Sequence, residues 1–175
     1  SKAAASGLMR SVNINAERYP WLVWSWKVHN ILQKGDVTRK QGDDYPARIY
    51  VAFAFDAGKA GWWERTRHKA ASLAAGRELP GTVLNYIWAN HAPVGLFVDN
   101  PYTSKAKMIV VRSGTQDLNH WMSERRNVLE DYKKAFGQPP PAIIGIAVMT
   151  DTDNTGEEAT AYYGDIAMES DRPNP

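Results

Sequence analysis

The sequence predicts a mainly β protein: an antiparallel β-sandwich with two short helical insertions, formed by residues 1–175 as a single domain. Several segments alternate apolar and polar residues, which is the period of a strand with one buried face. Gly, Pro, Asn and Asp separate these segments, and the regular alternation of strand and helix typical of a parallel sheet is missing. A chain of 175 residues is long enough to bury a substantial core.

The clearest strand is expected at Trp21–Val28, where large apolar residues alternate with Ser25 and Lys27. Ala47–Phe55 is expected to be a central strand covered on both faces, because Arg48 is its only charged residue. Further strands are expected at Val83–Trp88, Lys107–Arg112, Ala142–Met149 and Thr160–Met168, with a short segment Val12–Ile14 before them.

Two stretches favour helices. Trp62–Leu79 is rich in Ala, Arg and Lys and ends before a Pro-Gly pair, which breaks helices. Glu124–Phe136 places its apolar residues on one stripe, follows Ser123 as a candidate N-cap and stops at Gly137.

The composition excludes several function classes. With 21 Lys and Arg against 19 Asp and Glu, the net charge is only +2, so we expect no nucleic-acid partner. The chain has no cysteine, which excludes disulfides, zinc–thiolate sites and iron–sulfur clusters. No apolar run reaches the length of about 18 residues that a membrane span needs, so none is expected.

Asp43 and Asp44 immediately precede the strand that carries Arg48. We expect one of these carboxylates to point inward and meet the guanidinium, because a buried unpaired charge is strongly destabilising. Two interpretations remain open: a turn with a simple Asp–Arg contact, or a ligand or metal site at the edge of the sandwich.

The tryptophans divide into two groups. Trp24 and Trp26 share a face with aliphatic residues and are expected in the core. Trp88 ends a strand, and the loop that holds Asn100 and Tyr102 follows. Aromatic rings surrounded by polar groups suit sugars, whose C–H faces stack on the ring while their hydroxyls form hydrogen bonds. These three residues therefore join the candidate ligand site.

The segment from Asp151 to Gly156 is the best candidate metal site. Asp151, Asp153 and Asn154 offer oxygen ligands ahead of a glycine, as in the first half of a calcium loop. Tyr162 stands where an EF-hand has its bidentate glutamate, so this is not an EF-hand. The alternative is an ordinary acidic loop whose side chains form Asx-turns. No cofactor is established by the sequence, and calcium is the one candidate.

Eight motifs occur in family order along nearly the whole chain: ASGL, WLVWSWKV, DDYPARIYVAF, LNYIWAN, IVVRSG, ERRNVLEDYKKAFG, IIGIAVMTDTDNTG and YGDIAM. On them the chain resembles the bacterial family named domain of unknown function 3047. The resemblance implies a precursor with a signal peptide, and hence a periplasmic or secreted protein that is trimmed here at its N-terminus.

The closing strands are similar to those of galactose-binding-like jelly rolls and carbohydrate-binding modules. This similarity implies a jelly-roll connection of the strands. It also implies a role for Asp165, because an acidic residue in the last strand of such modules often holds a structural calcium.

Three functions follow as hypotheses. The first is an extracytoplasmic binding module for a glycan or related polymer, with structural calcium as an option. The second is a hydrolase or lyase acting on a polysaccharide, with Asp43, Asp44 or Asp131 as general acid or base and Arg48 as anion stabiliser. The third is a structural or assembly subunit that pairs through an edge strand of the sandwich.

The third hypothesis rests on the expected trimming. A sandwich that lacks its first strand exposes unpaired backbone groups along one edge. We expect a partner to fill the gap, either a second copy or a separate N-terminal fragment. Residues Ser1–Asn15 folding back are the less favoured alternative, because Ala3–Gly7 is too small to form a core-filling strand.

Overall fold

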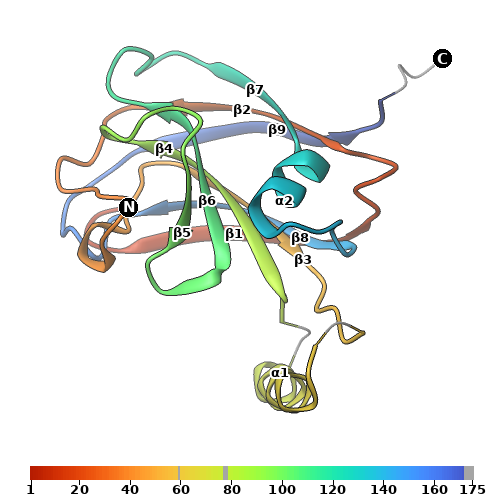
Figure 1. The fold of residues 1–175 in the computed structure, drawn as a ribbon. Coiled ribbons are helices and arrows are strands. Elements are labelled where there is room, and N and C mark those ends of the chain that lie inside the picture. Colours follow the sequence, from red (N-terminus) through yellow and green to blue (C-terminus); the bar gives the residue numbers. More distant parts are fainter. Residues whose placement is uncertain (59, 77–78, 172–175) are drawn as a thin grey trace.

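Two β-sheets pack against each other in a computed structural model that describes residues 1–58, 60–76 and 79–171 (Figure 1). The larger sheet has six strands in the spatial order β1 (Ala5–Ile14), β8 (Ile143–Asp151), β3 (Arg48–Phe53), β4 (Thr82–Ala89), β6 (Thr103–Ser113) and β5 (Phe97–Asn100). The smaller sheet has three, in the order β7 (Met122–Asn127), β2 (Trp21–Val28) and β9 (Ala161–Glu169). All neighbours are antiparallel except β4 and β6. The prediction of a mainly β, sandwich-like fold is confirmed.

Two α-helices interrupt the strands, as predicted: α1 (Trp62–Ala75) lies between β3 and β4, and α2 (Val128–Phe136) follows β7. A short 3-10 helix, η1 (Lys40–Gly42), precedes β3. The first helix ends earlier than expected, because Gly76 adopts the left-handed conformation (φ 63°) that terminates it. The prediction that it reaches Leu79 falls partly on residues 77–78, which lie outside the described residues.

The second helix begins later than expected. Asn127 is its N-cap and accepts a hydrogen bond from the Glu130 backbone (3.0 Å), so the prediction of Ser123 as the cap is wrong. The preceding residues form β7 because their charged side chains find partners inside the molecule. Glu124, for example, accepts hydrogen bonds from Trp26 Nε1 (3.1 Å) and Arg112 Nε (2.7 Å).

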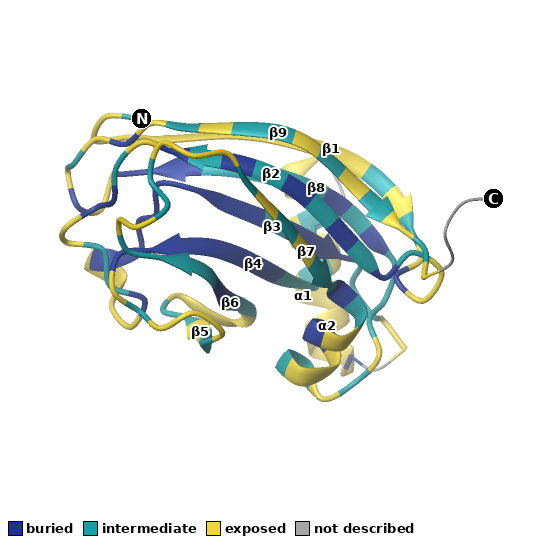
Figure 2. Cartoon of the chain, turned by 90° about the horizontal axis from the view of Figure 1, so that it is seen from above, coloured by how far each residue is buried: buried dark blue, intermediate teal, exposed yellow. Residues whose placement is uncertain are grey.

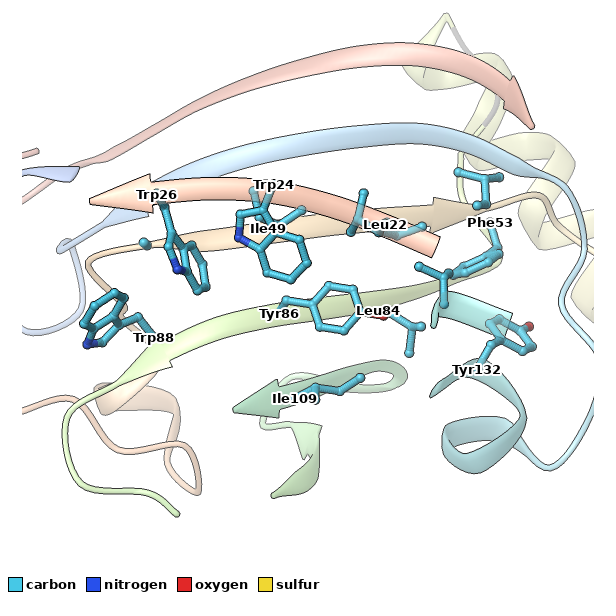
Figure 3. Packing of buried hydrophobic residues seen from close by; sticks show 14 of the residues in the cluster. Leu22, Trp24, Trp26, Ile49, Phe53, Leu84, Tyr86, Trp88, Ile109 and Tyr132 are labelled. Atoms are coloured by element: carbon cyan, nitrogen blue, oxygen red, sulfur yellow. The ribbon is translucent and has the colours of Figure 1, made fainter. Parts of the chain in front are cut away.

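The core between the sheets is built on aromatic rings from β2 and β4 (Figure 3). Trp24 and Trp26 are buried, as predicted, with their ring centroids 5.4 Å apart in an edge-to-face arrangement. Trp26 contacts Trp88 across the sandwich at 5.8 Å, and Trp24 contacts Tyr86 at 5.5 Å. Such pairs add to the stabilisation from burial alone.

Strand β3 is a central strand, as predicted, between β8 and β4. Ile49, Val51 and Phe53 point into the core and are fully buried. Arg48 and Tyr50 point to the opposite face of the sheet, because successive side chains of a strand alternate. One face of β3 therefore contributes to the core, and the other places Arg48 and Tyr50 on the outer face of the larger sheet.

The N-terminal residues fold back onto the larger sheet. Strand β1 pairs with β8, with Ala5 opposite Asp151. We expected a partner chain to occupy this edge of the sheet in preference to the N-terminal residues, and that expectation is wrong. The small side chains of Ala3–Gly7 do not prevent this pairing, because β1 is held mainly by backbone hydrogen bonds and most of its side chains are exposed (Figure 2). Among the residues that the structure describes, no strand pairs with the outer edge of β1, and assembly through an edge strand stays a prediction.

Over the described residues, no helix has the length and apolar character to cross a membrane. Figure 2 shows that burial is concentrated on β2, β3, β4 and β8, whereas β1 and α1 are largely exposed.

The aromatic core yields a stability prediction. Trp26 is fully buried, so Trp26→Ala should lower the free energy of unfolding by about 3–5 kcal/mol through lost burial and the cavity left behind. Trp121 is 53% exposed and serves as the matched control. Trp121→Ala should cost about 0.5 kcal/mol or less. Urea unfolding of the three proteins measures both values, and equal losses would contradict the assigned core.

Candidate functional site

The outer face of the larger sheet carries an open cavity of about 460 Å³. Beside it, Val37 and Tyr45 of the loop before β3 pack on Ile87, Ala89 and Met108, which covers the neighbouring part of this face. The cavity is lined by Ala5, Asp43, Arg48, Tyr50, Val83, Asn85, Asn100, Tyr102, Ala106, Met149, Asp151, Asp153 and Asn154. All six strands of the larger sheet and three loops therefore contribute to one site.

Arg48 is the centre of this site and is only 2% exposed. Its guanidinium forms ion pairs with Asp151 and, at 3.6 Å, with Asp43. It also donates a hydrogen bond to the Asp43 carbonyl oxygen (2.6 Å) and lies 4.7 Å from the ring centre of Tyr45 and 5.9 Å from that of Tyr50. The expected carboxylate partner at Asp43 is confirmed, and Asp151 is a second partner.

An acidic cluster borders Arg48. One carboxylate oxygen from each of Asp44, Asp151 and Asp153 lies within 4.8 Å of the others. Asp44 is held in place by a hydrogen bond from the Thr155 backbone N–H (2.6 Å). Oxygen ligands of this kind are those that calcium prefers, so the cluster fits a calcium ion.

Asn154 lies against the same cluster. One end of its amide is 3.1 Å from both Asp44 Oδ1 and Asp153 Oδ1, and the other is 3.2 Å from the Tyr102 hydroxyl. With the nitrogen toward the aspartates, the amide donates to both of them and accepts from Tyr102. With the oxygen toward them, a cation would be needed between the three acceptors, and Asn154 would then be one of its ligands.

A family model described as "Protein of unknown function (DUF3047)" matches residues 1–167. The chain belongs to the DUF3047 family. The match covers every residue of the cavity, from Ala5 to Asn154. No protein in a search of the curated proteins matches the chain.

The structure joins two sites that the sequence analysis treated separately. The ligand-site residues Asp43, Asp44, Arg48, Asn100 and Tyr102 lie together with the metal-site residues Asp151, Asp153 and Asn154. Asn100, for example, donates to Asp43 Oδ2 (2.9 Å). Loop and strand ends that are distant in the DUF3047 sequence thus form a single constellation.

Three sequence-predicted residues lie elsewhere. Trp88 is fully buried in the core, where its Nε1 donates to the Gly114 carbonyl oxygen (3.1 Å), so it presents no face to a ligand in the cavity. Asp165 is exposed on β9 in the smaller sheet, and it is not part of the acidic cluster. Asp131 is bound by Arg126 and is absent from the lining of the cavity.

Tyr50 and Asn85 line the cavity but were missed by the sequence analysis. Both had a signal. Tyr50 is two residues from Arg48 and so shares its face of the strand. Asn85 is the only polar residue in the run Val83–Trp88, and a polar side chain in an apolar strand needs a partner on one face.

Burial changes the acid strength of the two partners of Arg48. It raises the pKa of Asp151 from 3.8 to about 6, against the opposing effect of Arg48, while Asp44 and Asp153 raise it further. Burial also raises the pKa of Asp43, again opposed by Arg48 and by the hydrogen bond from Asn100. Carboxyls of this kind in a cavity are typical of functional sites.

Four buried polar atoms at the cavity have no hydrogen-bond partner: Asp43 Oδ1, Arg48 Nε, Asn85 Oδ1 and Asp151 Oδ1. Among the described residues, Trp24 Nε1 is the only other buried side-chain nitrogen or oxygen atom in this condition. Leaving such an atom unpaired costs about 1–3 kcal/mol. Their concentration in one place makes this cavity the candidate binding site.

The raised pKa of Asp151 predicts a pH-dependent stability. The folded state binds this proton more tightly than the unfolded chain, so its stabilising effect is full below the unfolded pKa of 3.8 and is lost as the pH rises through about 6. Asp151→Asn lacks this titration. Thermal unfolding with a chelator present should therefore show the parent losing stability relative to the variant across this pH range. A constant difference between them would contradict the raised pKa.

Proposed function

We propose that this protein is an extracytoplasmic binding module for a glycan or a related polymer, which it holds in the cavity on the outer face of the larger sheet. The observation that carries the proposal is the set of four buried polar atoms without partners at this one cavity. Three of them accept hydrogen bonds and one donates, so they suit a ligand that offers many hydroxyl groups.

The chemistry of the cavity supports a sugar in particular. Shifts of these lining side chains would let sugar hydroxyls donate to Asp43, Asn85 and Asp151 and accept from Arg48 Nε, which would pair atoms that are otherwise buried at a cost. Tyr102 is 55% exposed at the edge of the cavity and offers an aromatic surface to the C–H groups of a ring. Similar sites combine a few fixed polar groups with aromatic contact area.

The resemblance to galactose-binding-like jelly rolls supports the same proposal. We infer a jelly-roll relationship on that resemblance and on the sandwich-like packing of two mostly antiparallel sheets. A periplasmic or secreted location belongs to the proposal as well. It rests on the resemblance to a family whose members often carry signal peptides.

Two cavity variants test the ligand. After a polysaccharide or oligosaccharide has been selected on a glycan array, calorimetry should show binding about 5- to 10-fold weaker for Asn85→Ala, the value of one hydrogen bond. Tyr102→Ala should weaken binding through lost aromatic contact. Trp121→Ala removes an exposed aromatic residue that is absent from the cavity lining, and it should bind as the parent does. An array without a ligand, or variants with unchanged affinity, would refute the proposal.

A calcium ion is part of the proposal. Asp44, Asp151 and Asp153, with the Asn154 amide oxygen, supply oxygen ligands from two loops and the end of β8. A cation there would neutralise charges that are now crowded around a single guanidinium, and its removal would leave the carboxylates to repel each other. The expected ligand set therefore gains Asp44, whereas Asp165 lies on the smaller sheet.

Chelation tests the calcium site. A chelator should lower the melting temperature, and excess calcium should restore it by mass action. Asp153→Asn should lose most of this response, because it removes one of the three clustered carboxylates. Asp165→Asn is the matched control and should respond as the parent does. A melting temperature that ignores calcium in the parent protein would exclude the site.

A carboxylate-dependent enzyme acting on a polysaccharide is the second candidate, and one observation favours it. Asp151, with a pKa of about 6 beside a buried arginine, can carry a proton near neutral pH and donate it to a glycosidic oxygen. Calcium bound at Asp151 would keep it deprotonated, so the two roles exclude each other. Release of reducing ends or unsaturated products from the bound polysaccharide, lost in Asp151→Asn, would favour the enzyme.

A further inference from the structure

Helix α1 stands apart from the sandwich. Figure 1 shows it beyond the larger sheet, on the side opposite the smaller sheet, connected to β3 and β4 through the two loops on either side of it. None of its 14 residues is buried. A helix of this length is marginal in water unless it packs one face against something.

The helix exposes a mainly apolar face. At about 3.6 residues per turn, the side chains that project from this side are Trp62, Trp63, Ala70, Leu73 and Ala74, with Thr66 among them. The Thr66 hydroxyl donates to the Trp62 carbonyl oxygen (3.0 Å), so it is already paired within the helix. The largest of them are strongly exposed: Trp62 by 68%, Trp63 by 71% and Leu73 by 73%. The two tryptophan rings contact each other with centroids 4.7 Å apart, so they form one patch.

Contacts on the opposite side fix this orientation. The His68 ring stacks on Phe55 with centroids 3.9 Å apart, and its Nε2 donates to the Leu79 carbonyl oxygen (2.8 Å). Arg65 Nε donates to the Ala60 carbonyl oxygen (2.9 Å). The helix therefore turns its polar side toward the protein and its apolar face toward solvent.

Basic residues border the apolar face. The helix carries Arg65, Arg67 and Lys69 against Glu64, which gives 3 − 1 = +2 without His68. The helical period places Arg67 on one side of the apolar face and Lys69 on the other. Cations that flank an apolar face with tryptophans are typical of helices that lie in the interface of a membrane.

We propose that α1 docks the protein on an anionic membrane surface, with the helix lying parallel to the bilayer and both tryptophans among the lipid headgroups. The charge of the helix is complementary to anionic headgroups, and the side chains of its apolar face are exposed without any movement of the sandwich. With a rise of about 1.5 Å per residue the helix is far too short to span a bilayer, so it lies on the membrane. This proposal is independent of the ligand cavity.

Vesicle flotation tests the proposal with the full chain. The protein should bind vesicles containing equal parts of phosphatidylglycerol and phosphatidylcholine and should bind phosphatidylcholine alone weakly, with high salt releasing it. The double variant Trp62→Ala/Trp63→Ala should lose binding by about 10-fold or more, because it removes the apolar anchors. Trp121→Ala is the control and should bind as the parent does.

A second pair of variants tests the charges. Arg67→Ser/Lys69→Ser should weaken binding about 10-fold or more, since each basic residue near an anionic surface contributes about 1 kcal/mol. Arg10→Ser/Arg18→Ser removes two exposed cations outside the helix and should have little effect. Circular dichroism confirms folding of each variant.

Two results would contradict membrane docking by α1. No binding of the parent to the anionic vesicles, or equal binding by all variants, would overturn the proposal. A dimer in light scattering that Trp62→Ala/Trp63→Ala abolishes, without vesicle binding by the parent, would show that the patch binds a second copy of the chain instead.

Discussion

The buried guanidinium of Arg48 constrains the rest of the site. A charge that is 2% exposed needs partners close by, since removing them would leave it uncompensated at a cost of several kcal/mol. Asp43 reaches it from the loop before β3, and Asp151 reaches it from the end of β8, 103 residues away. Asn100 then binds Asp43 and brings the turn after β5 to the same place. One arginine thus assembles three separate segments.

The core and the cavity are the two faces of one sheet. Ile49, Val51 and Phe53 are held between the sheets, and this packing determines where Arg48 and Tyr50 lie on the other side. A sheet held by an aromatic core can tolerate buried groups without partners on its outer face, because burial in the core offsets their cost. The site is therefore preorganised by residues that never touch it.

The sequence predicts the features that rest on local pattern. Burial of one face of β2 leaves an alternation of apolar and polar residues, so the buried position of Trp24 was predictable. A lone charge in an apolar strand needs a counterion, so the Arg48–Asp43 ion pair was predictable as well. Partners distant in sequence leave no such signal. The start of Glu124–Phe136 was expected to be helical, whereas it forms a strand. The cause is not visible in the local pattern, because the side chain of Glu124 is bound by Trp26 and Arg112 of other strands. Asp151 was predicted only as a metal ligand, because its second role beside Arg48 depends on the pairing of β8 with β3.

The pairing of β1 with β8 also determines when the molecule can form. Ala5 lies opposite Asp151, so contacts between the two ends of the fold close a very long loop, and such contacts form late and slowly during folding. During synthesis, β1 has no strand to pair with until β8 has left the ribosome. Arg48 lacks its second ion-pair partner, Asp151, until the same moment. The unfinished polypeptide therefore lacks the completed sheet, and a product shortened before β8 would lack β1 pairing and the cavity together.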